Sequence, residues 1–208
     1  MGNSTIFSGL KVTLFGHASV MLEADGLRFY IDPFVLPKSV EAADAILYTH
    51  GHFDHCVPAP SITNQNTISI GHGCKLPGRV IEIGGRENVK GAVVEAVHAY
   101  NISKPFHPKG SGAGYLVQFK SVRAYHAGDT DFIPEMKDIR CDLALLPIGG
   151  TYTMNVNEAV AAVEAINPKV VVPMHYNYLD GTSASPEEFR KLVVERMAGK
   201  VDVRILLP

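Results

Sequence analysis

The sequence lacks the features that mark membrane, exported and nucleic-acid-binding proteins. No segment approaches the roughly eighteen consecutive apolar residues of a membrane span, and the first residues show no basic segment followed by a long apolar stretch. Lysine and arginine form no run, and the formal net charge is −2. These properties argue against a nucleic-acid surface. We therefore expect a soluble cytoplasmic protein without membrane insertion.

Cysteine is scarce, and its pattern excludes further classes. Cys56, Cys74 and Cys141 are widely spaced, odd in number and form no Cys-x-x-Cys pair. Neither a disulfide framework nor a thiolate zinc site is therefore predicted. We expect each cysteine to be a small buried apolar residue. Cys56 is noted because it directly follows His55, a candidate metal ligand.

The rest of the composition is that of an ordinary globular protein. The chain of 208 residues is 46% hydrophobic and 19% charged, enough apolar material for a core. No internal repeat, low-complexity tract, charge block or linker divides it. We expect residues 1–208 to form a single domain.

The first two thirds of the sequence indicate short β-strands. Residues 11–32 alternate as strands do and are broken at Asp25-Gly26, a strong hairpin signal between two apolar runs. Turns rich in Gly, Pro and Asn separate the later runs. These strand-like runs cover residues 67–70, 79–83, 89–97, 114–119, 122–126 and 142–146.

Helical patterns come late and lie between strands. Apolar residues recur at three- and four-residue spacing from Val156 to Ile166 and stop at Asn167-Pro168. After a strand at 170–172, Ser185-Pro186 supplies an N-cap and a first-turn proline for a second helix, and a last strand is expected at 203–207. This order predicts an α+β fold, a four-layer αββα sandwich of two mixed, mainly antiparallel sheets.

Four metal-binding side chains stand within six residues: His50, His52, Asp54 and His55. Side chains this close along a chain cannot all reach one tetrahedral ion without severe distortion of the backbone. Alternate residues of an extended segment point the same way, so His50 and His52 can share one ion while Asp54 and His55 reach a second. The run also follows the apolar strand-like residues 44–48, and strand ends that open into loops commonly carry sites.

Further ligands are expected at the ends of other predicted strands. His98 closes the run that ends at Val97, Asp129 follows the strand ending at His126, and His175 follows the strand that contains Val171 and Val172. All three have the same position relative to a strand as the first cluster.

The run Thr49-His50-Gly51-His52-Phe53-Asp54-His55 resembles the signature of the metallo-β-lactamase-fold hydrolases, and His98, Gly128-Asp129-Thr130 and Met174-His175 resemble their later ligand motifs. The resemblance extends from Gly16-His17 and Ile31-Asp32-Pro33 to His175-Tyr176. It is strongest to the small prokaryotic branch related to ascorbate-phosphate lactonase and to the phospholipase D acting on N-acyl phosphatidylethanolamine. Residues 125–130 and 147–152 carry this finer likeness.

The resemblance implies two divalent metal ions. It assigns His50, His52 and His98 to the first ion, Asp54, His55 and His175 to the second, and Asp129 to a bridge between them. Imidazoles and carboxylates suit zinc, with manganese or iron also compatible. A hydroxide shared by two such ions is a nucleophile at neutral pH. The expected reaction is hydrolysis of a phosphodiester, lactone or other small ester, with Asp54 orienting the hydroxide or carrying its proton.

Other polar residues are candidates for supporting roles. A leaving-group acid could be His17, His107, His126 or Tyr176, and Asp32 is better placed to orient a ligand than to be one. His107 lies in a Gly- and Pro-rich segment, residues 101–112, which we expect to form a loop over the cavity.

Three alternatives to this hydrolase stay open at this point. A di-iron oxidoreductase is weakened because oxygen-reducing relatives usually carry Glu where His52 stands, and no flavin domain is appended. A metal-dependent ribonuclease is weakened by the mild negative charge. A non-catalytic metal scaffold is weakened by the full set of ligands. The sequence leaves homo-oligomerisation open.

Overall fold

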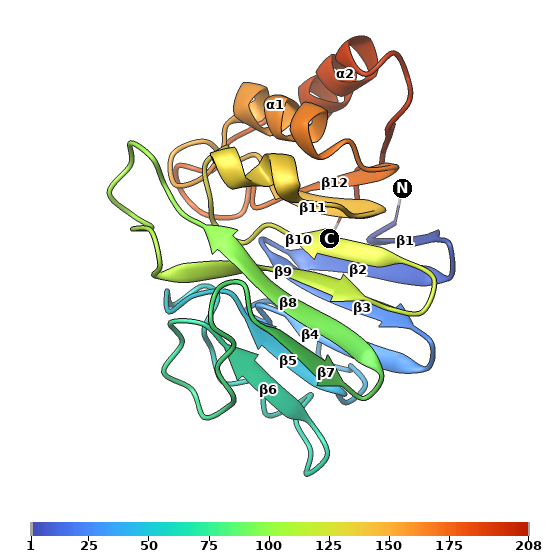
Figure 1. Cartoon of the computed structure of the whole chain (residues 1–208), viewed down its shortest axis with the longest axis vertical. Helices are drawn as coiled ribbons and strands as arrows, with labels where there is room; N and C mark the ends of the chain where they lie inside the picture. Colours follow the sequence, from blue (N-terminus) through green and yellow to red (C-terminus); the bar gives the residue numbers. More distant parts are fainter. Residues whose placement is uncertain (1, 208) are drawn as a thin grey trace.

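The computed structural model describes residues 2–207 and consists of two β-sheets packed face to face (Figure 1). The six-stranded sheet contains, in spatial order, β1 (Ser4–Phe7), β2 (Leu10–Gly16), β3 (Ser19–Ala24), β4 (Leu27–Ile31), β5 (Ala45–Tyr48) and β6 (Ile68–Gly71). The seven-stranded sheet contains, in spatial order, β13 (Asp202–Val203), β12 (Val170–Met174), β11 (Leu143–Pro147), β10 (Arg123–His126), β9 (Gly112–Gln118), β8 (Ala92–Ala99) and β7 (Arg86–Val89). The largest apolar cluster lies between the sheets and includes Leu22, Phe29, Tyr115 and Val172.

Both sheets are mixed, as the sequence predicts. Strands β3 and β4 form the expected hairpin at Asp25-Gly26, where both turn residues have positive φ. The pairs β4–β5 and β5–β6 are parallel, as are the successive pairs from β10 to β13. Parallel neighbours carry their carboxyl ends to the same edge of a sheet. Residues that follow these strands are therefore brought together.

Two predicted helices cover the outer face of the seven-stranded sheet (Figure 1). The first, α1 (Val156–Ile166), begins with a capping box in which Asn155 and Glu158 bond each other's backbone N–H groups. The second, α2 (Pro186–Arg196), starts at the predicted Ser185-Pro186 cap. A short 3₁₀ helix, η1 (Pro134–Asp138), lies beside them. No helix within residues 2–207 is long and apolar enough to cross a lipid bilayer.

The other outer layer is built from loops. Tyr30, Ile46 and Tyr48 point outward from the six-stranded sheet and pack against Ala59 and Ile62 of the segment that follows β5. The architecture is thus the αββα sandwich expected, although the described residues place no helix on this face.

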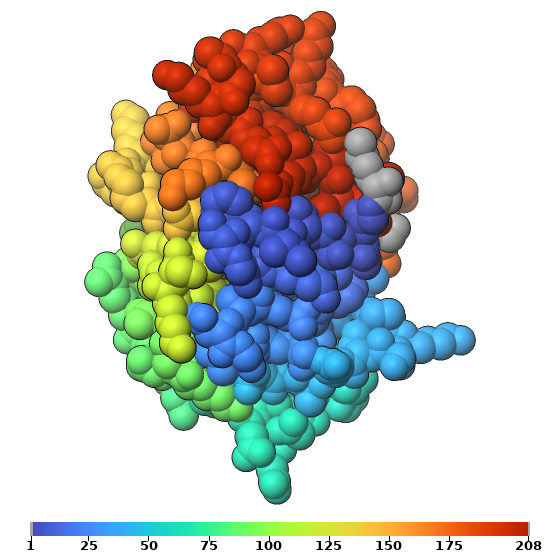
Figure 2. Space-filling view, turned by 90° about the vertical axis from the view of Figure 1, so that its right-hand side faces the viewer, coloured from blue at the N-terminus to red at the C-terminus, as the bar shows by residue number. Residues whose placement is uncertain are grey.

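The two ends of the described chain lie side by side. Figure 2 shows the N-terminal strands (blue) against the C-terminal segment (red), and the Leu207 N–H donates to the Gly2 carbonyl at 3.3 Å. The Arg204 guanidinium also donates to the Thr5 hydroxyl, from Nη1 at 2.8 Å. These contacts join the outer strand β1 to the segment after β13.

Several strand predictions were wrong in their bounds. Residues 79–83 form only an isolated bridge between Arg79 and Ile70. The run predicted at 89–97 is two strands, β7 and β8, because Lys90-Gly91 makes a tight turn with positive φ at both residues. The last strand is restricted to β13, and β1 was not predicted.

The prediction for two of the cysteines was also wrong. Cys56 and Cys74 form a disulfide with Cα atoms 5.7 Å apart. Pairing of β5 with β6 sets Tyr48 beside Gly71, so the segments after these two strands run next to each other. The disulfide ties the metal-binding segment to the end of β6. Cys141 is a half-buried free thiol.

Candidate metal centre

The candidate ligands gather where loops leave the two sheets. The segment of residues 50–55 follows β5, Asp129 follows β10 and His175 follows β12. His17 is in the turn between β2 and β3, and the loop after β8 contributes His107. Residues far apart in sequence therefore meet at the strand ends.

A first group brings together three imidazoles, those of His50, His52 and His107. His52 Nδ1 lies 3.0 Å from His50 Nε2 and 3.2 Å from His107 Nε2. His50 and His107 are buried, whereas His52 is exposed. Three ring nitrogens that face one another at this spacing suit a shared cation.

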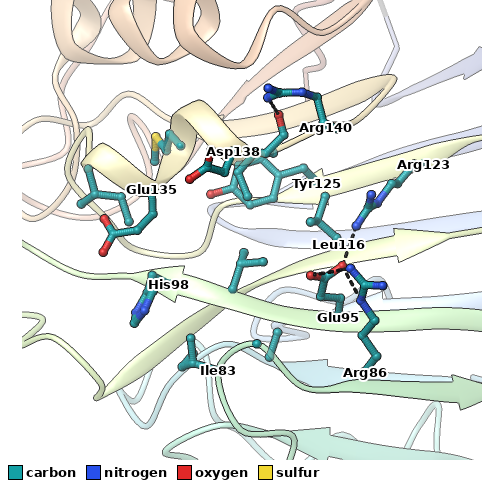
Figure 3. A pocket seen from close by; sticks show the side chains of 16 residues that line it. Ile83, Arg86, Glu95, His98, Leu116, Arg123, Tyr125, Glu135, Asp138 and Arg140 are labelled. Carbon is teal, nitrogen blue, oxygen red and sulfur yellow. Dashed lines mark hydrogen bonds and ion pairs between the residues drawn. The ribbon is translucent and has the colours of Figure 1, made fainter.

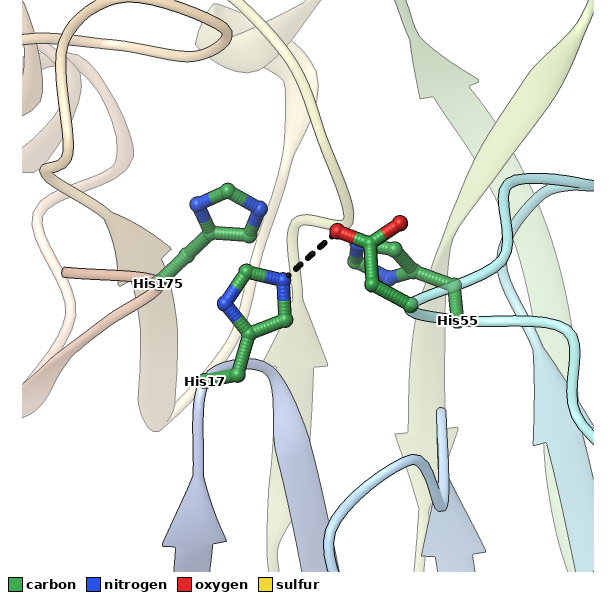
Figure 4. A group of neighbouring side chains, drawn as sticks. His17, His55 and His175 are labelled. Atoms are coloured by element: carbon green, nitrogen blue, oxygen red, sulfur yellow. Dashed lines mark hydrogen bonds and ion pairs between the residues drawn. The ribbon is translucent and has the colours of Figure 1, made fainter. Parts of the chain in front are cut away.

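A second group contains His17, Asp54, His55 and His175. His17, His55 and His175 converge in Figure 4, and the dashed line there marks the 2.9 Å contact from His17 Nε2 to Asp54 Oδ2. His55 Nε2 lies 3.6 Å from the same carboxylate oxygen. The rings of His17 and His175 are 3.9 Å apart between centroids.

Asp129 lies between the two groups. Its Oδ2 is 3.0 Å from His175 Nε2, 3.5 Å from His55 Nε2 and 3.4 Å from His107 Nε2. His50, His55 and Asp129 also form a third set of converging donors. A carboxylate in this position can contact ions on both sides.

Several buried polar atoms of this cluster have no partner in hydrogen-bonding geometry among the described residues, although His175 Nε2 lies 3.0 Å from Asp129 Oδ2: His17 Nδ1, His55 Nε2, His175 Nδ1 and Nε2, and Asp129 Oδ1. Buried polar atoms are normally paired, so such a concentration calls for a partner of another kind. The free atoms are imidazole nitrogens and a carboxylate oxygen, which are the donors that divalent first-row metals prefer. The residues therefore fit a metal centre.

Asp32 fixes the orientation of two of these histidines. Its fully buried carboxylate accepts from the Thr49 N–H (2.8 Å), the Thr49 hydroxyl (2.6 Å) and His55 Nδ1 (2.8 Å). Because the Thr49 hydroxyl donates to Asp32, its oxygen accepts from His50 Nδ1 at 3.0 Å. Both histidines thus carry their proton on Nδ1 and present Nε2 to the cluster.

Asn101 fixes the orientation of the His107 ring in the same way. Its Oδ1 accepts from both the backbone N–H and the ring Nδ1 of His107, each at 2.9 Å. Its Nδ2 donates to Asp131 Oδ1 and to the Tyr152 carbonyl, each at 3.0 Å. The loop is pinned in this way, and His107 Nε2 is left free to face His52.

The electrostatics favour ionised carboxylates and a neutral His50, the forms that bind metals, and a positive charge at His55. Burial, reinforced by the neighbouring His55, lowers the pKa of His50 to about 3. Burial opposes ionisation of Asp54, but the hydrogen bond from His17 and the nearby His55 outweigh it and lower the pKa of Asp54 to about 2. Burial also opposes a charged His55, yet Asp129 and Asp32 raise its pKa well above the usual range. The space between the Asp32 and Asp129 carboxylates thus favours a positive charge.

Backbone strain is concentrated at the centre. His17, Asp32 and His175 have φ values of 54°, 47° and 54°, in the left-handed region that side chains other than glycine seldom adopt. Such residues persist where the surrounding structure holds them, and they cluster at functional sites. Gly128 has φ 65°, and a Cβ there would lie 2.9 Å from the Ala113 carbonyl. A glycine is therefore required directly before Asp129.

His98 is not brought to the centre, so its prediction as a ligand was wrong. It belongs to β8 and lines a separate pocket with Glu95, Leu116 and Tyr125, as Figure 3 shows. The chain continues beyond β8 and folds back through the Asn101 contacts, which place His107 in the first group instead. The sequence predicts His107 only as a possible acid in a loop.

Two of the candidate leaving-group acids, His126 and Tyr176, make contacts that support the fold. His126 donates from Nε2 to the Ala18 carbonyl at 3.0 Å and accepts from the Gly128 N–H at 3.2 Å. It therefore braces the turn that carries Asp129. Tyr176 packs against the apolar cluster beneath α1 and α2.

Comparison with known proteins agrees with this fold. Residues 11–175 match the β-lactamase superfamily domain. A UPF0173 metal-dependent hydrolase of Methanosarcina mazei is 37% identical, with 95% of each chain covered. A solved structure from Parabacteroides distasonis, described as a metal-dependent hydrolase, has a TM-score of 0.85 at 31% identity and covers 99% of this chain and 98% of its own. Igni18, a metallo hydrolase of Ignicoccus hospitalis, has a TM-score of 0.80 at 31% identity, with coverage of 96% and 95%.

Two sheets packed with helices outside and a histidine-rich centre at the strand ends define the metallo-β-lactamase fold. The chain belongs to the β-lactamase superfamily. Within it, the protein is a metal-dependent hydrolase.

Proposed function

We propose that this protein holds two divalent metal ions and hydrolyses a small ester, lactone or phosphodiester. The observation that carries the proposal is the division of the donors into two groups on either side of Asp129. His50, His52 and His107 would hold one ion, Asp54, His55 and His175 the other, and Asp129 would contact both. Zinc suits this set best, and manganese or iron is compatible with it.

Two such ions, when bound, supply a water of lowered pKa and a Lewis acid for the substrate oxygen. The residues of the chain position these groups. Asp54 lines the cavity and is held by His17 Nε2, so its carboxylate is oriented to accept a hydrogen bond from the attacking water. Asp32 and Asn101 keep the ring nitrogens of His50, His55 and His107 directed at the centre.

The number of ions is tested by elemental analysis of protein dialysed after metal loading. We expect two equivalents in the wild type and a clear loss in Asp129→Ala, with hydrolysis of a broad ester and phosphodiester panel falling in parallel. Fewer than two equivalents at saturating metal, or unaltered turnover in Asp129→Ala, would contradict the proposal. Reloading with zinc, manganese or iron identifies the metal that supports turnover.

The assignment of His107 has a matched control in the same chain. His107→Ala should lose about one equivalent of metal, because it removes one of three ligands of the first group. His98→Ala changes the same residue type on the strand that leads into that loop, and it should retain both ions. Equal metal loss in the two variants would count against the assignment.

A further inference from the structure

The cavity at the metal centre has a volume of about 460 Å³, which is within the usual range for a small-molecule site. Its lining consists of His52, Phe53, Asp54, Phe106, His107, Asp129, Tyr152, His175, Leu179 and Asp180. Of the five lining residues that are not candidate metal ligands, four are aromatic or aliphatic: Phe53, Phe106, Tyr152 and Leu179.

The aromatic side chains are attached to the ligand-bearing loops themselves. Phe53 stands between His52 and Asp54 and is 71% exposed. Its ring meets Phe34 edge to face, with centroids 6.2 Å apart, and Phe34 meets Tyr178 in the same way at 6.1 Å. An exposed aromatic group rimming a cavity marks a surface that an apolar partner covers.

A second aromatic pair comes from two other loops. Phe106, next to His107, packs edge to face against Tyr152 with centroids 4.8 Å apart. Phe106 is 38% exposed. Apolar surface is therefore offered from several loops within a few residues of the metal donors.

Among residues 2–207, no Lys or Arg contributes to this lining, and its charged members apart from histidine are Asp54, Asp129 and Asp180. The two lysines of the neighbouring loop are already paired. Lys104 donates to Asp131 (2.6 Å) and to the Thr153 carbonyl (2.7 Å), and Lys109 donates to Glu135 (2.7 Å). Sites for phosphate esters commonly add Arg or Lys to hold the oxygens that do not react.

We infer that the substrate is an uncharged carboxylic ester or lactone with an apolar acyl group, which lies against Phe53 and Phe106. This inference rests on the proposed hydrolase function and narrows its substrate class. In the reaction the oxygen of water bonds to the carbonyl carbon, the carbon–oxygen bond of the ester breaks, and the alcohol leaves with a proton. An ester gives a carboxylic acid and an alcohol, and a lactone gives one hydroxy acid, so water is the only other reactant needed.

The test compares substrates on the metal-loaded full chain. We expect kcat/KM to rise from p-nitrophenyl acetate to the octanoate and to exceed that for bis-p-nitrophenyl phosphate. Phe53→Ser should lower kcat/KM for the octanoate by about 10-fold to 100-fold, the range for loss of an apolar contact in a pocket, and change the acetate far less. Phe53→Leu should restore most of the loss. Elemental analysis must find the same metal content in both variants as in the wild type.

A matched control and a binding measurement complete the design. Ile6→Ser removes another exposed apolar side chain, from β1, and should leave all rates unchanged. Calorimetry with 2-nonanone, which has the heptyl chain and carbonyl of the octanoyl group but no leaving group, should show weaker binding in Phe53→Ser. Metal-dependent cleavage that favours the phosphodiester, or ignores Phe53 and chain length, overturns the inference while the hydrolase proposal stands. Absence of metal-dependent hydrolysis for every substrate overturns both.

Discussion

Replacing Asp32 by Asn tests whether one buried carboxylate orients two metal ligands. Asp32 accepts three hydrogen bonds, two from Thr49 and one from His55 Nδ1. An Asn at this position keeps one acceptor oxygen and introduces an NH₂ group that faces a donor. Where the NH₂ group takes the place of Oδ2, His55 can relieve the clash only by moving its proton to Nε2, the atom that faces the cluster; where it takes the place of Oδ1, it faces the Thr49 N–H instead. Thr49 loses its acceptor as well, and with it the constraint on His50.

The magnitude follows from these contacts. A hydrogen bond to a charged group contributes about 1.5–3 kcal/mol, and loss of a residue that orients a ligand typically costs about 10-fold to 100-fold in metal affinity. We therefore expect Asp32→Asn to weaken binding of the ion held by His55 by about 10-fold to 100-fold, which equals about 1.4–2.7 kcal/mol. The free energy of unfolding of the metal-free protein should fall by about 1–3 kcal/mol, because a buried donor is left unpaired.

Competition with a chromophoric chelator measures the affinity, and urea denaturation measures the stability. Asp44→Asn is a suitable control, since Asp44 also accepts from a backbone N–H and a side chain, those of Arg28 and Lys90, but at the opposite end of β5. That variant should bind metal like the wild type. A folded Asp32→Asn protein with unchanged affinity for both ions would refute the role of Asp32 in orienting the ligands.

Three other changes follow from the same geometry. Asn101→Ala should weaken metal binding about 10-fold to 100-fold in a chelator competition, because it frees the His107 ring; an unchanged affinity would show that the loop is held by other contacts. Cys74→Ser should lower the free energy of unfolding by about 3 kcal/mol in urea, the entropy of closing a loop of 18 residues to Cys56; reductant should have the same effect on the wild type and none on the variant. Gly128→Ala should destabilise the protein by more than about 1 kcal/mol, since its positive φ and the crowding at its Cβ both oppose a side chain, and calorimetry would detect the lower Tm.

The parts of the centre that the sequence predicts are those fixed by local patterns. Asp129 and His175 each follow an apolar strand, and a strand end places the next residues within narrow limits. The cluster from His50 to His55 can be predicted for the same reason, because it follows the apolar strand β5. Alternating and helical periodicities also predict the hairpin at Asp25-Gly26 and both helices, because each depends on neighbouring residues.

The errors arise where distant contacts decide the structure. His107 reaches the centre because Asn101 bonds Asp131, a contact across 30 residues that no local pattern reveals. The disulfide depends on parallel pairing of β5 with β6, which brings Cys56 and Cys74 together. The Gly- and Pro-rich sequence around His107 does indicate a loop over the cavity. The position of His98 at the end of a predicted strand nevertheless favours His98 as the ligand.

The same loops that escape prediction also carry the residues that would contact substrate. Phe106 is adjacent to His107, and Phe53 is flanked by His52 and Asp54, so metal binding and substrate contact share backbone segments. A loop that is ordered by its metal ligand then also presents its aromatic side chain in a fixed position. Loss of an ion from the first group should therefore disturb the apolar wall. The strand ends supply the chemistry of hydrolysis, while the bond that is cut depends on how these loops fold over the centre.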